Sequence, residues 1–204
     1  MQNKINMQDS SSIPEARGRI MLAAYKGDEH TVRSFLQDPH PSLRAASLSG
    51  LLQMKAATID DGANAVCDSD DVVRLRACEL APHLPGADYI KLLDSDNYII
   101  VEAACFAVGE VRDSHGLEKL INIALNHKEP ICRESAVAAL GAIGNKKALP
   151  CLIEKLDDSA NIRRRAVLAL SVFIETAEAL EAIKSRINDK DWQVRQIVEN
   201  ILFR

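Results

Sequence analysis

Apolar residues along this chain recur at steps of three and four positions, which is the spacing of one face of an α-helix. Residues 149–156 and 162–173 show the pattern clearly, and residues 117–125 and 180–187 repeat the first of the two stretches. Each stretch is long enough for two or three helical turns, and turn residues separate it from the next. The pattern predicts pairs of antiparallel helices.

These predicted helix pairs repeat along the chain. The second helix of each pair carries an arginine, or a residue in its place, near its start, and an aspartate precedes it in most copies. The six anchor positions are spaced 27 to 32 residues apart: Arg44, Arg74, Val101, Arg133, Arg163 and Arg195. Self-similarity at this period is typical of helical solenoids, in which each hairpin buries its apolar face against its neighbours. We therefore expect six stacked hairpins.

Capping residues support the predicted helix starts. Ser12 and Glu15 form a capping-box pair at the start of a helix expected over residues 13–26, which would cover the first hairpin. Thr58 and Asp61 repeat the motif at a later start, with aspartate in place of glutamate.

The helix ends are predicted from glycine and proline. Gly109 and Gly144 lie near predicted ends, where a left-handed cap favours glycine. Pro82 falls inside the second helix of the second hairpin and should shorten or kink it. The polar residues 1–12 are expected to be a disordered tail, and residues 13–204 a single solenoid domain.

The repeated pattern resembles the HEAT repeat, in the short form also found in phycobilisome lyase-type HEAT proteins. It consists of an Asp, an Arg preceded by Val, Ile or Leu, and then small and apolar positions, and it covers about residues 29–203. The resemblance implies an all-α fold, a right-handed α-α superhelix. It also implies a hydrogen-bonded ladder of Asp and Arg side chains along the turns. The acids would be Asp38, Asp68, Asp94, Asp157 and Asp189, and the arginines Arg44, Arg74, Arg133, Arg163 and Arg195. Val101 and His127 should interrupt this ladder in its centre.

Composition narrows the choice of function. Hydrophobic residues make up 47% of the chain and charged residues 26%, as in soluble folded proteins. The net charge of −4 weighs against nucleic acid as the partner, because a duplex binder must neutralise several phosphates. The polar start and the lack of a long apolar run predict a cytoplasmic protein without a membrane span.

Candidate catalytic and metal-binding groups do not form recognisable motifs. The five cysteines include no C-x-x-C pair and mostly lie on apolar helical faces, so we expect them in the core. The HEAT-like deoxyhypusine hydroxylases use His-Glu pairs to hold iron, and this sequence contains no His-Glu dipeptide. Nucleotide-binding and hydrolase motifs are missing as well. We therefore expect no cofactor, no metal and no catalytic activity.

The run from Arg163 to Arg165 is the sharpest basic feature, with Lys146 and Lys147 one helix earlier. One interpretation is a nucleic-acid contact of the kind made by HEAT-like alkylpurine DNA glycosylases. The other is an ordinary solvated face, because several acidic residues lie close by in the sequence.

A candidate binding surface follows from the anchors. Positions one and five residues after each anchor should lie beside the core on the second helices, which line the inner, concave surface of HEAT arrays by resemblance. These positions give Leu75, Glu79, Glu102, Phe106, Glu134, Arg164 and Leu168. Apolar side chains flanked by carboxylates would suit a partner helix or a basic peptide. The alternative is that Phe106 and Leu168 are buried between neighbouring hairpins, and Trp192 is expected to pack at the start of the last helix.

These observations predict a non-catalytic scaffold that binds another protein. Two alternatives stay open: an accessory subunit of a bilin-lyase-type enzyme, and a nucleic-acid binder that uses Arg163 to Arg165. A homodimer through the apolar C-terminal helix, which carries Ile197, Ile201 and Phe203, is also possible on the sequence alone.

Overall fold

The computed structural model describes residues 12–203, which form helices, turns and loops without a β-strand. They divide into two compact units, residues 12–87 and residues 88–203. Apart from Ser12, the predicted disordered tail lies outside the described residues. A single solenoid domain over residues 13–204 stays a prediction.

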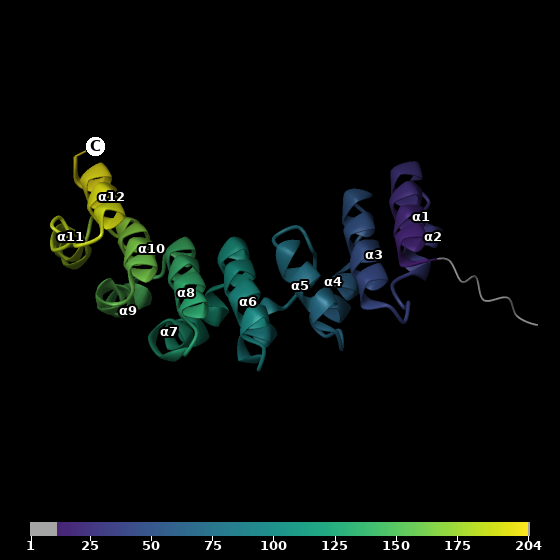
Figure 1. The fold of residues 1–204 in the computed structure, drawn as a ribbon, viewed down its shortest axis with the longest axis horizontal. Coiled ribbons are helices and arrows are strands. Elements are labelled where there is room, and N and C mark those ends of the chain that lie inside the picture. Colours follow the sequence, from purple (N-terminus) through teal and green to yellow (C-terminus); the bar gives the residue numbers. More distant parts are fainter. Residues whose placement is uncertain (1–11, 204) are drawn as a thin grey trace, which may run out of the picture. The chain divides into compact units, whose positions relative to one another are not determined.

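The first unit contains one covering helix and two hairpins (Figure 1). Its elements are α1 (Ile13–Lys26), α2 (Glu29–Ser34), α3 (Pro41–Gln53), α4 (Ile59–Val66) and α5 (Asp71–Glu79). Helix α1 packs against α2 and α3, and α3 packs against α5. The predicted covering helix is therefore confirmed, with the bounds that the capping box indicated.

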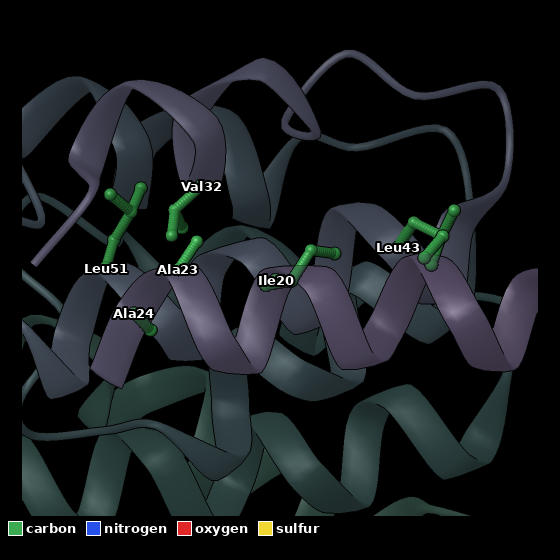
Figure 2. Close-up of a cluster of buried hydrophobic side chains, with 7 residues drawn as sticks. Ile20, Ala23, Ala24, Val32, Leu43 and Leu51 are labelled. Atoms are coloured by element: carbon green, nitrogen blue, oxygen red, sulfur yellow. The ribbon is translucent and has the colours of Figure 1, made fainter. Parts of the chain in front are cut away.

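The core of the first unit shows why α1 is needed. Ile20, Ala23 and Ala24 of α1 are buried against Val32 of α2 and Leu51 of α3 (Figure 2). Small alanines let the helix axes approach closely, and a branched aliphatic side chain from each neighbour fills the remaining space. Without α1, the apolar sides of α2 and α3 would face water.

Local signals set the helix bounds in this unit as predicted. The Ser12 N–H donates to the Glu15 carboxylate over 2.9 Å, and the Thr58 N–H donates to Asp61 over 2.7 Å. Helix α5 ends at Glu79, so Pro82 does shorten the second helix of its hairpin.

The second unit contains four hairpins, in which the second helices stand side by side in one row and the first helices in another (Figure 1). The second helices are α6 (Tyr98–Val111), α8 (Pro130–Ile143), α10 (Ala160–Ser171) and α12 (Trp192–Leu202). The first helices are α7 (Leu117–Asn126), α9 (Leu149–Glu154) and α11 (Ala177–Lys184). The third hairpin of the chain has only the 3-10 segment η1 (Tyr89–Asp94) in place of a first α-helix, and short 3-10 turns η2 (Ser114–Gly116), η3 (Lys146–Ala148) and η4 (Lys155–Asp157) flank α7 and α9.

Two glycines allow the second helices to approach closely. A Cβ on Gly109 would lie 2.9 Å from the Cα of Ala139, and a Cβ on Gly141 would lie 2.7 Å from the Cβ of Ala169. The prediction that Gly109 caps a helix end is wrong, because it lies inside α6 and the left-handed cap is Arg112, with φ 52°. Gly144 is a left-handed cap as predicted, with φ 68°.

The Arg–Asp ladder joins neighbouring hairpins, and Arg163 shows its geometry best. Its Nε and Nη2 donate to the two carboxylate oxygens of Asp189 over 2.9 and 2.7 Å. Its Nη1 donates to the carbonyl oxygen of Asp158 in the turn before its own helix, over 2.9 Å. One guanidinium therefore holds two successive turns together, and both side chains of the ion pair are about 95% buried.

The same geometry recurs at two other predicted arginines. Arg44 binds the Asp68 carboxylate at 2.9 and 2.6 Å, and Arg133 binds the Asp158 carboxylate at 3.1 Å twice. The predicted acid Asp157 is wrong: it is exposed and pairs with Arg186 instead. The turn before Arg163 is one residue shorter than the others, since Arg163 reaches a carbonyl five residues back and Arg133 reaches one six residues back.

Other predicted ladder residues have different partners. Asp38 contributes its carbonyl oxygen to Arg44 at 2.9 Å, and its carboxylate accepts from the N–H of His40. Arg74 pairs with Asp71 and Asp94 with Lys119, so the Asp94 assignment is also wrong. Arg195 donates to the carbonyl oxygens of its own turn, Asp189 and Lys190, over 2.7 and 3.3 Å.

The predicted interruption of the ladder at Val101 and His127 is confirmed, and the structure explains why it is tolerated. Val101 is buried, so an apolar contact replaces the ionic one. His127 keeps the other functions of its turn position: its carbonyl oxygen accepts from Arg133, and its Nδ1 accepts from the N–H of Glu129. Ser95, six residues before Val101, caps the N–H of Asn97 in the same way.

A further rung, missed by the sequence analysis, joins α2 to α4. Arg33 donates to both oxygens of Asp61 at about 3 Å and to the carbonyl oxygen of Ala56 at 2.6 Å. Arg33 lies on a first helix and outside the repeated spacing, so only its capping-box partner gave a signal.

Ladder carboxylates have pKa values below the ordinary range. Burial alone would raise the pKa of Asp189, but hydrogen bonds from Arg163 and from the N–H of Asp191, with the charge of Arg163, outweigh burial. The pKa of Asp158 is lowered in the same way, by hydrogen bonds from Arg133 and from the N–H of Ser159 that outweigh burial. These carboxylates are therefore ionised in the folded chain at neutral pH.

Asp189→Asn should lower the free energy of unfolding by about 3 kcal/mol, because it leaves the Arg163 guanidinium buried without a counter-charge. Glu181→Gln is the matched control: its pair with Lys184 is mostly exposed, and its removal should cost at most about 0.5 kcal/mol. Urea unfolding measures both, and equal costs would contradict the importance given to the buried rung.

The stabilisation from Asp189 should also depend on pH. Its pKa is lower in the folded chain than in the unfolded chain, so its contribution is complete above the unfolded pKa of about 3.9 and is lost as the pH falls through the folded pKa. The stability difference between the wild type and Asp189→Asn should therefore stay constant from neutral pH down to about pH 5 and shrink as the pH falls further, through the folded pKa of Asp189. A difference that stays constant or grows toward acid pH would refute this assignment.

Gly141→Ala should destabilise the second unit by about 1–3 kcal/mol, because the new methyl group meets the Ala169 backbone of a packed neighbour. Gly18→Ala on α1 is the control, since a Cβ there meets nothing within 4 Å. It should stabilise by up to about 1 kcal/mol through helix propensity. Thermal unfolding of the two variants would show opposite shifts.

Candidate functional site

The candidate site lies on the solvent side of the second-helix row in the second unit. Phe106 on α6 is 51% exposed and Leu168 on α10 is 44% exposed. The alternative in which these two side chains are buried between hairpins is therefore wrong. Trp192 is 59% exposed, so its predicted packing role is wrong as well.

Between α6 and α8 lies a cavity of about 330 Å³, which we call the acidic lobe. It is lined by Glu102, Phe106, Gly109, Glu110, Glu134, Ser135, Ala138, Ala139, Ala142 and Arg165. Three of the predicted residues, Glu102, Phe106 and Glu134, thus come together in one hollow. The exposed ring of Phe106 has carboxylates on both sides of it along α6.

Polar contacts between neighbouring helices orient the carboxylates of the acidic lobe. Ser135 Oγ donates to Glu102 over 3.0 Å, and Arg165 Nε donates to Glu134 over 3.2 Å. Glu110 forms no ion pair with any residue from 12 to 203. Arg165 is the only cation lining this lobe, so its lining residues carry a net charge of −2 at neutral pH.

Between α8 and α10 lies a second cavity of about 460 Å³, which we call the apolar lobe. Its lining includes the predicted residue Leu168 together with Val172, Ile143 and Ala169, and Arg112 and Arg165 are its cations. Ala138, Ala142 and Arg165 line both lobes. The two lobes therefore form one groove that crosses α8 over two alanines.

The close packing of the helices and the small residues on α8 shape this groove. Gly109 and Gly141 form part of its floor, where side chains would fill it. Ala138 and Ala142, one turn apart on α8, make that helix a low ridge between the lobes.

The other predicted site residues do not join this groove. Arg164 bonds to Gln193, Asn161 and the carbonyl oxygen of Ala160, and it lines neither lobe. Leu75 and Glu79 lie in the first unit, where they line a cavity of about 500 Å³ between α1, α3 and α5.

Sequence reasoning missed Glu110 and Val172, although a signal for both existed. They lie nine residues after the anchors Val101 and Arg163, one helical turn beyond the positions that were considered. Arg112 had no such signal, since it follows the end of α6 as the helix cap.

The basic run does not form a cationic surface. Arg163 is 4% exposed within the ladder, Arg164 bonds across to α12, and Arg165 pairs with Glu134 on α8. Because each guanidinium has a different partner, the three do not converge on one anion. This arrangement weakens the nucleic-acid interpretation.

Within residues 12–203, neither the cysteines nor the metal-binding side chains form an arrangement that supports catalysis. Burial raises the pKa of Cys132 and of Cys151 to about 11, so both thiols are protonated at neutral pH. Four of the five cysteines are buried, as predicted from their apolar helical faces, and Cys67 is the exception, because it is exposed. No three His, Cys, Asp or Glu side chains in the described chain gather as a metal would require.

A bilayer-spanning helix is missing from the described part of the chain, where no helix combines the length and the apolar character that spanning demands.

Known proteins support the fold. No curated protein matches the sequence significantly. An engineered protein from the Northeast Structural Genomics Consortium aligns with a TM-score of 0.62 at 14% identity, over 86% of this chain and 95% of its own. A designed armadillo repeat protein in complex with the peptide (KR)4 aligns with a TM-score of 0.57 at 16% identity, over 95% of this chain and 99% of its own. A structure of computationally designed armadillo repeat proteins for modular peptide recognition aligns with a TM-score of 0.55 at 16% identity. The alignment covers 94% of this chain and 99% of the designed chain.

Identities this low show the fold alone, which is an all-α helical repeat. The family of HEAT repeats matches residues 86–171, which span η1 through α10 and include every groove residue except Val172. The stacked hairpins and the ladder rungs at Arg133 and Arg163 agree with that match, and residues 86–171 of this chain are similar to HEAT repeats.

Proposed function

We propose that this protein is a non-catalytic scaffold that binds a segment of another protein in the groove across α6, α8 and α10. The observation that carries the proposal is the exposure of Phe106 and Leu168 in a continuous hollow lined by oriented charges. Exposed apolar side chains that line a concave surface with a polar rim are typical of protein-binding sites.

The similar designed proteins support the same class of partner. One of them was solved with the peptide (KR)4, and others were designed for modular peptide recognition. A peptide segment is therefore the partner that we propose for this chain.

Other possibilities stay hypotheses. A bilin-lyase accessory role, a cytoplasmic location and binding of nucleic acid have no specific observation in their favour. For a homodimer through α12, Phe203 is exposed while Ile197 and Ile201 are only partly so, which leaves a modest apolar surface.

Replacing Phe106 and Leu168 together by serine should weaken capture of the partner at least tenfold, since central apolar anchors typically contribute 2 kcal/mol or more. The measurement is quantitative affinity purification from the native cell extract, with a photo-crosslinking residue at Ala142 in the groove. Phe203→Ser is the control, because it removes a phenylalanine that is even more exposed and lies outside the groove. Partners captured equally by all three proteins would rule out this surface, provided that circular dichroism shows them equally folded.

A further inference from the structure

We propose that the groove selects an extended segment in which a lysine or arginine lies three residues from a large apolar side chain. The cationic side chain would occupy the acidic lobe and the apolar side chain the apolar lobe. This proposal rests on the proposed function and names the chemical class of its partner.

The acidic lobe suits a single cation. Its three carboxylates, Glu102, Glu110 and Glu134, approach from two helices, and only Arg165 opposes them. Glu102 is oriented by Ser135, and Glu110 has no ionic partner among residues 12–203. A lysine or arginine from a partner would therefore complete a charge balance that the folded chain leaves open.

Phe106 adds a specific contact for the same side chain. Its half-exposed ring lies in the lobe between Glu102, one turn before it, and Glu110, one turn after it. The apolar stem of a lysine or arginine can pack on the ring, and the charged end can interact with the ring face and the carboxylates. An apolar or acidic side chain would lose one or both of these contacts.

The apolar lobe sets the register of the segment. Leu168, Val172 and Ile143 offer apolar surface, while Arg112 and Arg165 line the same cavity. These two arginines would repel a second cation, so the basic residue of the segment is directed to the acidic lobe and its apolar residue to the apolar lobe.

Helix spacing sets the distance between the two side chains. The lobes lie on either side of α8, and the axes of packed helices are about 8–10 Å apart. In a polyproline II segment, residues i and i+3 lie on the same side and about 9 Å apart. The alanine ridge of α8 leaves room for the intervening backbone, because Ala138 and Ala142 rise least above the helix.

The test is a nitrogen-15 NMR titration of the whole chain with blocked synthetic peptides. The probe is Gly-Pro-Lys-Pro-Pro-Leu-Pro-Gly, together with its reversed sequence, because the direction of the segment is open. In the matched peptides glutamate replaces the lysine. We expect the lysine peptide of one direction to bind at least about fivefold more tightly than its glutamate counterpart, with the largest shifts at the amides of Gly109 and Gly141, and we expect added salt to narrow the difference.

The double variant Glu102→Gln/Glu110→Gln should bring the lysine and glutamate peptides to within about twofold of each other. Glu118→Gln/Glu178→Gln is the matched control: it removes two exposed carboxylates from the first-helix row and should keep most of the preference. Because both double variants remove two negative charges and change the net charge of the protein from −4 to −2, the comparison separates a local site from general attraction.

Three results would overturn the proposal: no shifts at millimolar peptide, equal affinities for the lysine and glutamate peptides, or a preference that both double variants reduce alike. Its failure is distinguishable from failure of the proposed function. If the Phe106 and Leu168 variant still loses its native partner, the groove binds a protein of different chemistry; if capture is unaffected, both proposals fall.

Discussion

The stacking of this protein depends on one side chain that bridges two turns. The guanidinium of a ladder arginine donates to a carbonyl oxygen of its own turn and, through two parallel bonds, to the carboxylate of the next hairpin. Only a planar group with several fixed donors can satisfy both at once. At Arg44, Arg133 and Arg163 the bridge joins one turn to the next, and it holds those neighbouring hairpins in a defined register near the starts of their second helices.

Where the bridge is missing, close packing takes its place. Between α6 and α8 the anchor is the buried Val101, and the helices meet through Gly109 and Ala139. Between α8 and α10 both devices are present, since Arg133 binds Asp158 and Gly141 meets Ala169. The lapse in the ladder therefore does not open the row of second helices.

The groove is a consequence of the same packing. Small residues that let the axes approach also leave shallow hollows on the solvent side, and α6, α8 and α10 each contribute side chains to them. A partner segment that crosses the row meets a different side chain on each helix. The chemistry of the surface can therefore vary from hairpin to hairpin while the buried contacts stay the same, and in this chain the variation places an acidic hollow beside an apolar one.

The sequence by itself determined the helices, the six repeats, the covering helix and most of the arginine anchors, because these follow from local periodicity and from capping motifs only a few residues long. It also placed Glu102, Phe106 and Glu134 on one surface, since positions one and five residues after an anchor share a helix face. Only the tertiary structure decided which acid each arginine meets: one residue fewer in the turn before Arg163 makes Asp158, and not Asp157, the partner of Arg133. The tertiary structure also decided that Arg164 bonds to α12 and that Gly109 allows close packing against α8. Both depend on the distance and rotation of the neighbouring helix, which a local sequence pattern does not contain.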